Sequence, residues 1–152
     1  MGALTGATFR PGTGADAIDG VLPRQVVEPD SAREVAAVLE QAARERLTVV
    51  LRGGGTKIGW GRPPAALDLV VGLRRLNRLI AHAHADLTVA VEAGATVAEV
   101  NAALAGHSQW LHLDAPEGAT SGGVIATIDS GPLRNRYGTP RDLLIGVQLA
   151  TT

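Results

Sequence analysis

Two glycine-rich stretches constrain this chain more than any other feature of its sequence. The first glycine loop, residues 53–57, reads Gly-Gly-Gly-Thr-Lys and follows the apolar segment 47–51. The second glycine stretch, residues 118–123, reads Gly-Ala-Thr-Ser-Gly-Gly. Consecutive glycines leave peptide N–H groups uncovered and permit positive φ, so the backbone can curl around a phosphate as a nest of donors. The pattern favours a phosphate-bearing cofactor over a plain turn, the usual explanation of an isolated glycine pair.

Two familiar phosphate loops do not fit these residues. A P-loop needs Gly-x-x-x-x-Gly-Lys-Ser/Thr at the start of a helix. Here Thr56 precedes Lys57, and the glycines and prolines at positions 59, 61, 63 and 64 prevent a helix from following. A dinucleotide-binding Rossmann turn needs Gly-x-Gly-x-x-Gly, but Ile58 stands where the third glycine belongs. Neither a P-loop nor the usual NAD fold is therefore expected.

Composition narrows the classes of protein further. The chain has 152 residues, of which 45% are hydrophobic, 19% charged and 3% aromatic, with a net charge of -1, which is typical of a folded domain. Near-zero charge and few aromatic residues offer no footprint for nucleic acid. No apolar run is long enough for a transmembrane segment, and the N-terminus lacks the pattern of a signal peptide. The absence of cysteine excludes disulfides and cysteine-ligated iron–sulfur clusters and fits a cytoplasmic protein.

Hydrophobic spacing predicts alternating strands and helices, an α+β layered fold. A helix is expected from residue 32 to about 46, with capping-box spacing at Ser31 and Glu34. A second helix is expected after Thr96, ending at Gly106. Residues 1–24, rich in glycine and proline, are expected to form a loose lead-in with few buried contacts. The predicted strands are 25–27, 47–51, 66–71, 87–91 and 143–150, with a turn over 73–79. The predicted core faces of the helices are Val35, Val38, Leu39 and Ala42, and Val97, Val100 and Leu104.

Five motifs in a fixed order resemble a known family. They are Pro-Asp-Ser at 29–31, the segment 49–56, Val-Glu-Ala-Gly-Ala-Thr at 91–96, the second glycine stretch, and Arg-Tyr-Gly at 136–138 with Arg-Asp at 141–142. Together they resemble the FAD-binding domain of the vanillyl-alcohol oxidase / p-cresol methylhydroxylase superfamily. Residues 131–143 are most similar to the FAD-binding subunits of glycolate oxidase, within the D-2-hydroxyacid dehydrogenases. The resemblance implies a first FAD-binding subdomain at 25–117 and the start of a second at 118–152.

The resemblance also implies where FAD is held. The backbone N–H groups of the first glycine loop would hold the pyrophosphate, with Lys57 as weaker electrostatic support. Arg52 either contacts phosphate or closes its strand in an ion pair. The second glycine stretch would form the opposite wall, followed by a short helix at 124–127 whose N-terminus favours phosphate. The implied cofactor-binding residues are Gly53, Gly54, Gly55, Thr56, Lys57, Gly118, Thr120, Ser121, Gly122, Gly123, Ser130, Gly131 and Val147.

Three of these residues have alternatives. Ser130 and Gly131 resemble the next cofactor-lining turn, but Ile128 and Asp129 replace the Asn-Ala that often precedes it. Val147 would pair its backbone with the adenine edge, or it is an ordinary strand residue. A substitution of Gly54→Val is expected to weaken FAD binding while leaving the fold largely intact.

Histidine and tyrosine residues add no predicted catalytic group. Several members of the superfamily attach FAD through a histidine at the position of Thr56, so non-covalent FAD is expected here. His82 and His84 would point to one side if this segment were a strand, but two ligands without a third do not make a metal site, and none is predicted. The other two histidines, His107 and His112, flank Trp110 and are expected to pack at a subdomain edge. Tyr137 either approaches the cofactor or closes a turn. No Gly-x-Ser-x-Gly nucleophile elbow is present.

As a whole, the resemblance implies a flavin-dependent oxidoreductase that acts on a 2-hydroxy acid of the glycolate or D-lactate type. Hydride would pass to flavin while a base takes the hydroxyl proton. No counterpart of a substrate-binding domain is visible, so the chain resembles an N-terminal fragment and is expected to be inactive alone. The expected partners are a flavoprotein and an iron–sulfur subunit, through which a cytoplasmic protein would reach the inner membrane. The alternatives are a non-catalytic FAD-binding or assembly subunit and a binder of another phosphorylated ligand.

Overall fold

The computed structural model describes residues 7–151, which belong to two compact units. The first unit contains the chain up to Arg52, Ile58–Leu76 and the residues from Gln148 onward. The second contains Gly53–Lys57 and Asn77–Val147. Both glycine segments therefore belong to the second unit, although 60 residues of sequence lie between them. The units do not follow the expected boundary between residues 117 and 118, and the assignment of FAD-binding subdomains stays a prediction.

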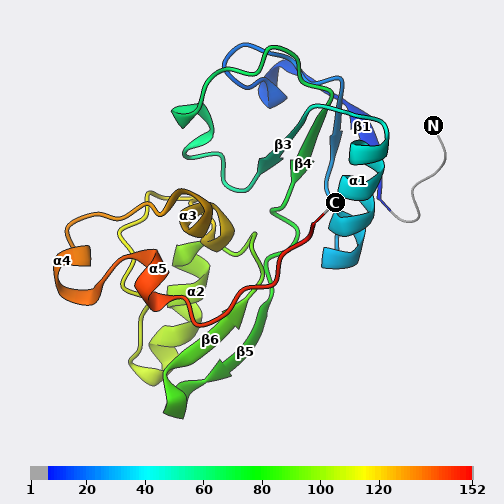
Figure 1. Cartoon of the computed structure of the whole chain (residues 1–152). Coiled ribbons are helices and arrows are strands. Elements are labelled where there is room, and N and C mark those ends of the chain that lie inside the picture. The colour runs from blue at the N-terminus through cyan, green and yellow to red at the C-terminus, as the bar shows by residue number, and fades with distance from the viewer. Residues whose placement is uncertain (1–6, 152) are drawn as a thin grey trace. The chain divides into compact units, whose positions relative to one another are not determined.

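A four-stranded sheet forms the centre of the first unit (Figure 1). Its order is β1-β2-β4-β3, with β2 and β3 parallel to β4 and β1 antiparallel to β2. Helix α1 (Ala32–Arg44) connects β2 to β3. The strands are β1 (Phe9–Pro11), β2 (Gln25–Val27), β3 (Val49–Arg52) and β4 (Leu69–Gly72). The short 3-10 helix η2 (Ile58–Trp60) follows the first glycine loop.

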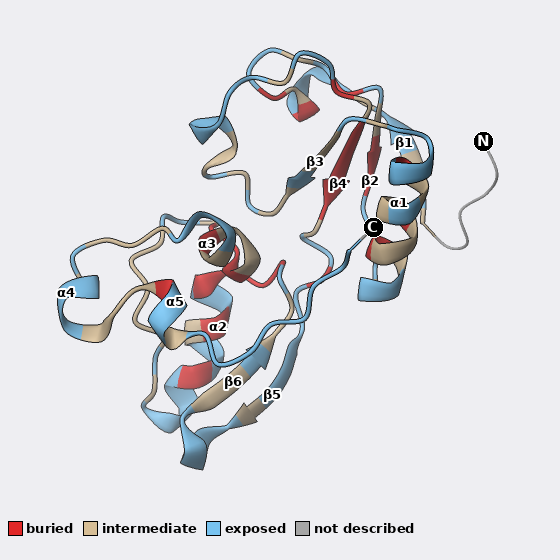
Figure 2. Cartoon of the chain, viewed as in Figure 1, coloured by how far each residue is buried: buried red, intermediate tan, exposed pale blue. Residues whose placement is uncertain are grey.

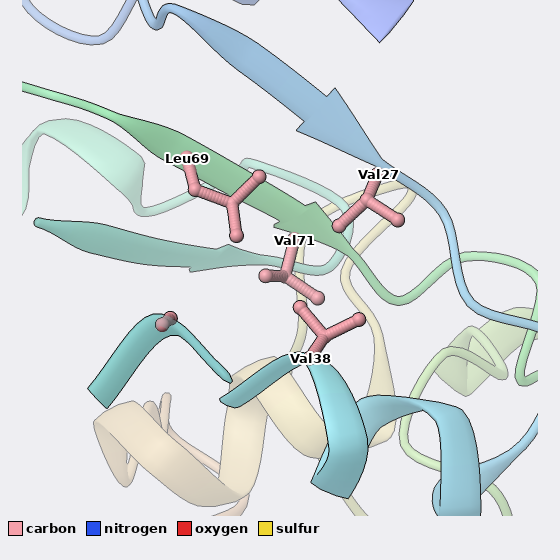
Figure 3. Close-up of a cluster of buried hydrophobic side chains, with 5 residues drawn as sticks. Val27, Val38, Leu69 and Val71 are labelled. Atoms are coloured by element: carbon pink, nitrogen blue, oxygen red, sulfur yellow. The ribbon is translucent and has the colours of Figure 1, made fainter. Parts of the chain in front are cut away.

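Helix α1 begins as its sequence predicts, with one difference at the cap. Ser31 Oγ accepts the Glu34 N–H at 3.2 Å, whereas the Glu34 carboxylate accepts from the backbone of Asp30, one residue before the expected donor. Figure 3 shows Val38 of this helix facing Val71 of β4. All four residues of β4 are buried (Figure 2), because one apolar cluster covers each face of the strand. Of the predicted helix face, Val35, Val38 and Ala42 are buried and Leu39 is half-buried.

The expectation of a loose lead-in is wrong for residues 7–24. Strand β1 pairs with β2, the 3-10 helix η1 spans Gly14–Asp16, and Ile18 is buried in a core cluster. Asp16 is buried as well, where it pairs with two arginines. Glycine and proline correctly indicated a segment without long helices, but the partners that order it lie elsewhere in the chain. The part of this prediction that falls on residues 1–6 lies outside the described residues.

The second unit combines a hairpin with short helices (Figure 1). Strands β5 (Leu79–Ala83) and β6 (Thr88–Val91) are antiparallel and are joined by η3 (His84–Asp86). Helix α2 (Val97–Leu104) has the complete capping box of Thr96 and Glu99, and its three predicted inward residues are buried, as expected. A 3-10 helix, η4, follows at Ala105–His107. The remaining helices are α3 (Ser121–Thr127), α4 (Arg134–Tyr137) and α5 (Pro140–Leu143).

The predicted final strand at 143–150 is wrong. Leu143 is the last residue of α5, and residues 144–150 form neither strand nor helix. Ile145, Val147 and Leu149 are 84%, 60% and 73% exposed (Figure 2). A strand requires a neighbour that takes up its backbone hydrogen bonds, and none of the described residues pairs with this segment. An apolar sequence alone cannot supply that neighbour.

Within residues 7–151, no helix is both long and apolar enough to cross a membrane.

Candidate functional site

The first glycine loop lies directly against the second glycine stretch. A Cβ atom placed on Gly54 would be 1.9 Å from the carbonyl oxygen of Gly118, and one placed on Gly53 would be 2.2 Å from Thr120 Oγ1. Both distances are far inside van der Waals contact, so no side chain fits at either position. Gly55 has a φ of 74°, which favours glycine for conformational reasons. Contact between the two segments, and not only approach of a phosphate, thus accounts for the glycines.

The N–H groups of the first glycine loop are the part of the site that remains available. No backbone N–H of Gly53, Gly54, Gly55 or Thr56 donates to the described part of the chain. Gly54 and Thr56 are exposed. Backbone donors need a partner, whether protein, water or ligand. Consecutive N–H groups in a turn with positive φ form a concavity suited to an anion. The donor set of this loop therefore fits a phosphate group.

The second glycine stretch uses its own donors inside the unit. Three of its N–H groups and one hydroxyl hold it against segment 92–95 and against its own helix cap. The hydrogen bonds are Ser121 N–H to Ala95 O at 2.7 Å, Gly122 N–H to Ala93 O at 2.9 Å, Gly123 N–H to Thr120 Oγ1 at 3.3 Å and Ser121 Oγ to Glu92 O at 3.0 Å. A Cβ on Gly122 would lie 2.7 Å from Ala93 Cβ. We call the second glycine stretch the clamp, because it holds the start of α3 against segment 92–95.

Helix α3 starts earlier in the chain than the sequence predicted. It begins at Ser121 with Thr120 as its N-cap, three residues before the expected start at Val124. Because the N–H groups of residues 121–123 are already bonded, they are not free to donate to a phosphate. Contact between the second glycine stretch and a cofactor through other atoms stays a prediction.

Arg52 is ion-paired, as one of its two expected roles required. Its Nη2 lies 2.9 Å from Asp16 Oδ1. Asp16 also accepts from both Nη atoms of Arg10, at 2.6 and 2.8 Å, and from Thr13. The two guanidinium groups hold the pKa of the Asp16 carboxyl well below its usual range, with hydrogen bonding to Arg10 as the largest cause. Arg52 is thus the last residue of β3, and its side chain is held by Asp16. The first glycine loop follows it directly in the sequence.

A second ion pair joins the first glycine loop to the residue after Ile128. Lys57 Nζ lies 2.6 Å from Asp129 Oδ2, and the two side chains are only 19% and 15% exposed. The sequence singled out Lys57 as electrostatic support for a phosphate, but it did not identify Asp129 as a partner. Charge complementarity at positions 72 residues apart was the only signal available.

The turn that contains Ser130 and Gly131 is held by Asp114. Asp114 Oδ2 accepts the Leu133 N–H at 2.6 Å, and a Cβ on Gly131 would lie 2.6 Å from the same carboxylate oxygen. Sequence reasoning missed this aspartate. Val147 is exposed and lies outside any strand, so its predicted pairing with an adenine edge loses the strand on which it was based. Cofactor contacts of these residues stay predictions.

The histidines and Tyr137 form two ring clusters in the second unit. His84 stacks on His107 at 4.3 Å between centroids, and His82 Nε2 bonds Gln109 Oε1 at 2.8 Å. Tyr137 stacks on His112 at 4.1 Å, with Trp110 edge-on to both rings. Tyr137 is the last residue of α4 and directly precedes the C-cap Gly138, whose φ is 87°. The described residues contain no group of three ligating side chains arranged for a metal ion.

Comparison with known proteins identifies the class. The family described as FAD binding domain matches residues 23–152, and the chain belongs to that family. The D-lactate dehydrogenase of Archaeoglobus fulgidus is 32% identical over 125 residues, covering 81% of this chain and 28% of the relative. The D-2-hydroxyglutarate dehydrogenase of Xanthomonas citri is 34% identical over 131 residues, covering 85% and 28%. The chain thus spans about a quarter of the length of these curated relatives.

Solved structures agree with this family. An alkyldihydroxyacetonephosphate synthase superposes with a TM-score of 0.74 at 25% identity, covering 82% of this chain and 24% of that one. GilR, an oxidoreductase of gilvocarcin biosynthesis, gives 0.67 at 31% identity, covering 80% and 25%. The predicted α+β fold of the p-cresol methylhydroxylase type and the prediction of FAD as the cofactor are confirmed.

Proposed function

We propose that this chain is the FAD-binding portion of a flavin-dependent oxidoreductase that oxidises a 2-hydroxy acid of the glycolate or D-lactate type. The observation that carries the proposal is the set of unused N–H groups on Gly53–Thr56, held in place against the second glycine stretch. The substrate class rests on the relatives, which are named as dehydrogenases of D-lactate and D-2-hydroxyglutarate and as a glycolate oxidase subunit.

Each glycine segment has its own part in holding FAD. The N–H groups of Gly53, Gly54, Gly55 and Thr56 donate to the pyrophosphate, and the Thr56 hydroxyl adds a donor. The second glycine stretch packs against this loop through Thr120 and Gly118. The turn at Ser130 and Gly131 extends the lining of the FAD site. Bound FAD supplies the redox chemistry as a hydride acceptor.

FAD is held without a covalent bond in this proposal, because a threonine hydroxyl at position 56 cannot form a histidyl link. Acid precipitation of the flavin-loaded protein is the measurement. All flavin should appear in the supernatant, and yellow colour that stays with the pellet would contradict the proposal.

The activity is tested on the protein produced from its whole gene. We expect flavin absorbance and turnover of glycolate, D-lactate or D-2-hydroxyglutarate with an artificial dye acceptor. The 152-residue chain alone should bind FAD weakly and show no turnover, since it covers about a quarter of its relatives. Bound FAD without turnover of any of the three acids would favour a non-catalytic FAD-binding or assembly subunit. A protein without flavin affinity would favour another phosphorylated ligand.

The glycolate oxidase relative in Bacillus subtilis is named as a subunit, which supports an assembly with partner chains. We propose a cytoplasmic assembly with a second flavoprotein and an iron–sulfur subunit. Affinity purification from the native cell, followed by mass spectrometry and iron analysis, tests this part separately from the activity.

A further inference from the structure

Lys57 is the only lysine in the sequence, and the structure uses it in an ion pair. Its partner Asp129 follows the last turn of α3, where Ile128 adopts the left-handed conformation of a helix C-cap. The Asp129 N–H donates to Val124 O at 3.3 Å, which attaches this residue to the end of the helix. Asp129 therefore lies in the loop just beyond α3, where this hydrogen bond attaches its backbone to the end of the helix.

The other end of the first glycine loop is attached at the opposite end of the same helix. Gly53 packs on Thr120, the N-cap of α3, and Gly54 packs on Gly118 just before it. The loop thus has one attachment at the N-terminal end of α3 and one at the C-terminal end. Gly55 and Thr56 span the distance between them.

We propose that Asp129 is a positioning residue that acts through Lys57. By holding Lys57 at the end of α3, it keeps the first glycine loop in the conformation in which its N–H groups converge on the FAD pyrophosphate. This inference rests on the proposed function. In this arrangement the Lys57 ammonium serves the protein carboxylate, and the peptide N–H groups serve the phosphate.

The alternative, a direct contact between Lys57 and phosphate, predicts the opposite sign for one substitution. Asp129→Asn removes a negative charge near an anionic ligand and releases a lysine from its carboxylate. If Lys57 contacts phosphate directly, FAD affinity should rise, since charge-assisted bonds to phosphate are strong. If the pair positions the loop, affinity should fall.

FAD affinity is measured by flavin fluorescence titration of the protein from its whole gene. We expect Asp129→Asn and Lys57→Asp to weaken binding by about tenfold, as for the loss of one coupled contact. Asp129→Glu, which keeps the carboxylate, and the exchanged pair Lys57→Asp with Asp129→Lys should each recover most of the lost affinity. The matched control is Asp30→Asn, which makes the same charge change in the exposed Asp30–Arg75 ion pair. Both residues of this pair belong to the first unit, whereas Lys57 and Asp129 belong to the second. This control variant should leave binding unchanged.

A second measurement needs no cofactor. Within residues 1–152 a lysine-specific protease can cut only after Lys57, and the Lys57 side chain must first leave its ion pair. Cleavage at this site in the protein from its whole gene is followed by mass spectrometry of the N-terminal fragment. We expect Asp129→Asn to be cut several times faster than wild type without FAD, with Asp30→Asn at the wild-type rate. The thermal unfolding midpoint of each variant is measured to show that all variants are folded at the temperature of the cleavage assay.

Each result decides a different part of the proposal. Unchanged or tighter FAD binding by Asp129→Asn, or an exchanged pair as weak as the single variants, would overturn the positioning role. An unchanged rate of cleavage would overturn the attachment itself. A wild-type protein without FAD affinity would overturn the proposed function and, with it, the role of the pair toward FAD, whatever the protease shows.

Discussion

The first glycine loop and the second glycine stretch have similar compositions but differ in how many of their backbone N–H groups are hydrogen-bonded. In the first, the N–H groups of Gly53–Thr56 donate to nothing in the described chain. In the second, the N–H groups of Ser121, Gly122 and Gly123 are all bonded within the unit. Glycine serves close packing in both segments, because Gly54 and Gly122 each lie against a neighbouring backbone. Four consecutive N–H groups without an acceptor in the described chain occur in the first segment, whereas in the second only the separate N–H groups of Gly118 and Thr120 lack one.

This difference shows that glycine content alone does not mark a phosphate site. A glycine tolerates either a ligand or another segment at its Cβ position, and the sequence is the same in both cases. The two roles are separated by where the backbone N–H groups are directed, which depends on neighbouring segments.

The largest effect is expected at the clamp. In Gly122→Ala the new methyl would lie 2.7 Å from Ala93 Cβ and 2.9 Å from Ala93 O. We expect the unfolding free energy of the second unit to fall by about 3 kcal/mol, as for other overpacked sites. Trp110 fluorescence during urea unfolding, in a Trp60→Phe background, reports on this unit. Gly106→Ala, where nothing lies within 4 Å, should change stability by less than about 0.5 kcal/mol. Equal effects at both positions would contradict the clamp.

A somewhat smaller effect on stability, with a larger effect on the cofactor, is expected for Gly54→Val. The sequence alone predicted an intact fold, but the carbonyl oxygen 1.9 Å from the Cβ position contradicts that expectation. We expect a loss of about 2 kcal/mol, because this exposed loop can shift more than a helix can. FAD affinity should fall by more than tenfold. Gly61→Val, at an open position, is the control. A variant with wild-type stability and weak FAD binding would restore the sequence-based expectation.

The third effect concerns the buried Asp16 carboxylate, which pairs with Arg10 and Arg52 in the first unit. Asp16→Asn should cost about 2 kcal/mol in the first unit at pH 7, because the carboxylate accepts hydrogen bonds from two guanidinium groups. Its pKa is lowered in the folded state, so this stabilisation is present above about pH 4, its ordinary value, and is lost as the pH falls toward the folded pKa.

Urea unfolding followed by Trp60, in a Trp110→Phe background, checks this from pH 7 to pH 2.5. The difference between wild type and variant should shrink as the pH falls. A difference that stays constant would show that the charge of Asp16 contributes nothing.

The smallest effect on stability is expected for Thr56→Ala. This residue is exposed, and its side chain makes no hydrogen bond within the described chain, so stability should change by less than about 0.5 kcal/mol. FAD affinity should fall a few-fold through loss of one hydroxyl donor. The comparison with Gly122→Ala separates a residue that serves the ligand from one that serves the fold. Unchanged affinity would leave the N–H groups as the only donors of the loop.

The helices were the most predictable part of the fold. Helix α2 has its capping box at Thr96 and Glu99 and its inward Val100, and helix α1 buries Val38 as its spacing predicts. Both signals are local, because they depend on residues three or four positions apart. The strand predicted at 143–150 failed for the opposite reason. Its apolar residues indicate a strand only where a neighbour is present, and the described chain provides none.

The candidate site was also predictable only where its signals are local in the sequence. The sequence identified both glycine segments, the family motifs and Lys57. It did not reveal Asp129 and Asp114, because an acidic residue in a loop has no local signature of its partner. It also did not reveal that residues 7–24 are ordered by β2 and by Arg52.

By itself, the sequence determined the family, the two capped helices and the position of the glycine segments, since motif order and short-range periodicity are properties of the chain. The tertiary structure decided that Gly53 and Gly54 lie against Thr120 and Gly118. It also decided that the N–H groups of residues 53–56 stay unbonded within the described chain while those of residues 121–123 are bonded, and that Lys57 pairs with Asp129. The physical reason is that hydrogen bonds and ion pairs between distant segments depend on where the fold places both partners. Residue type at one position specifies only half of each interaction.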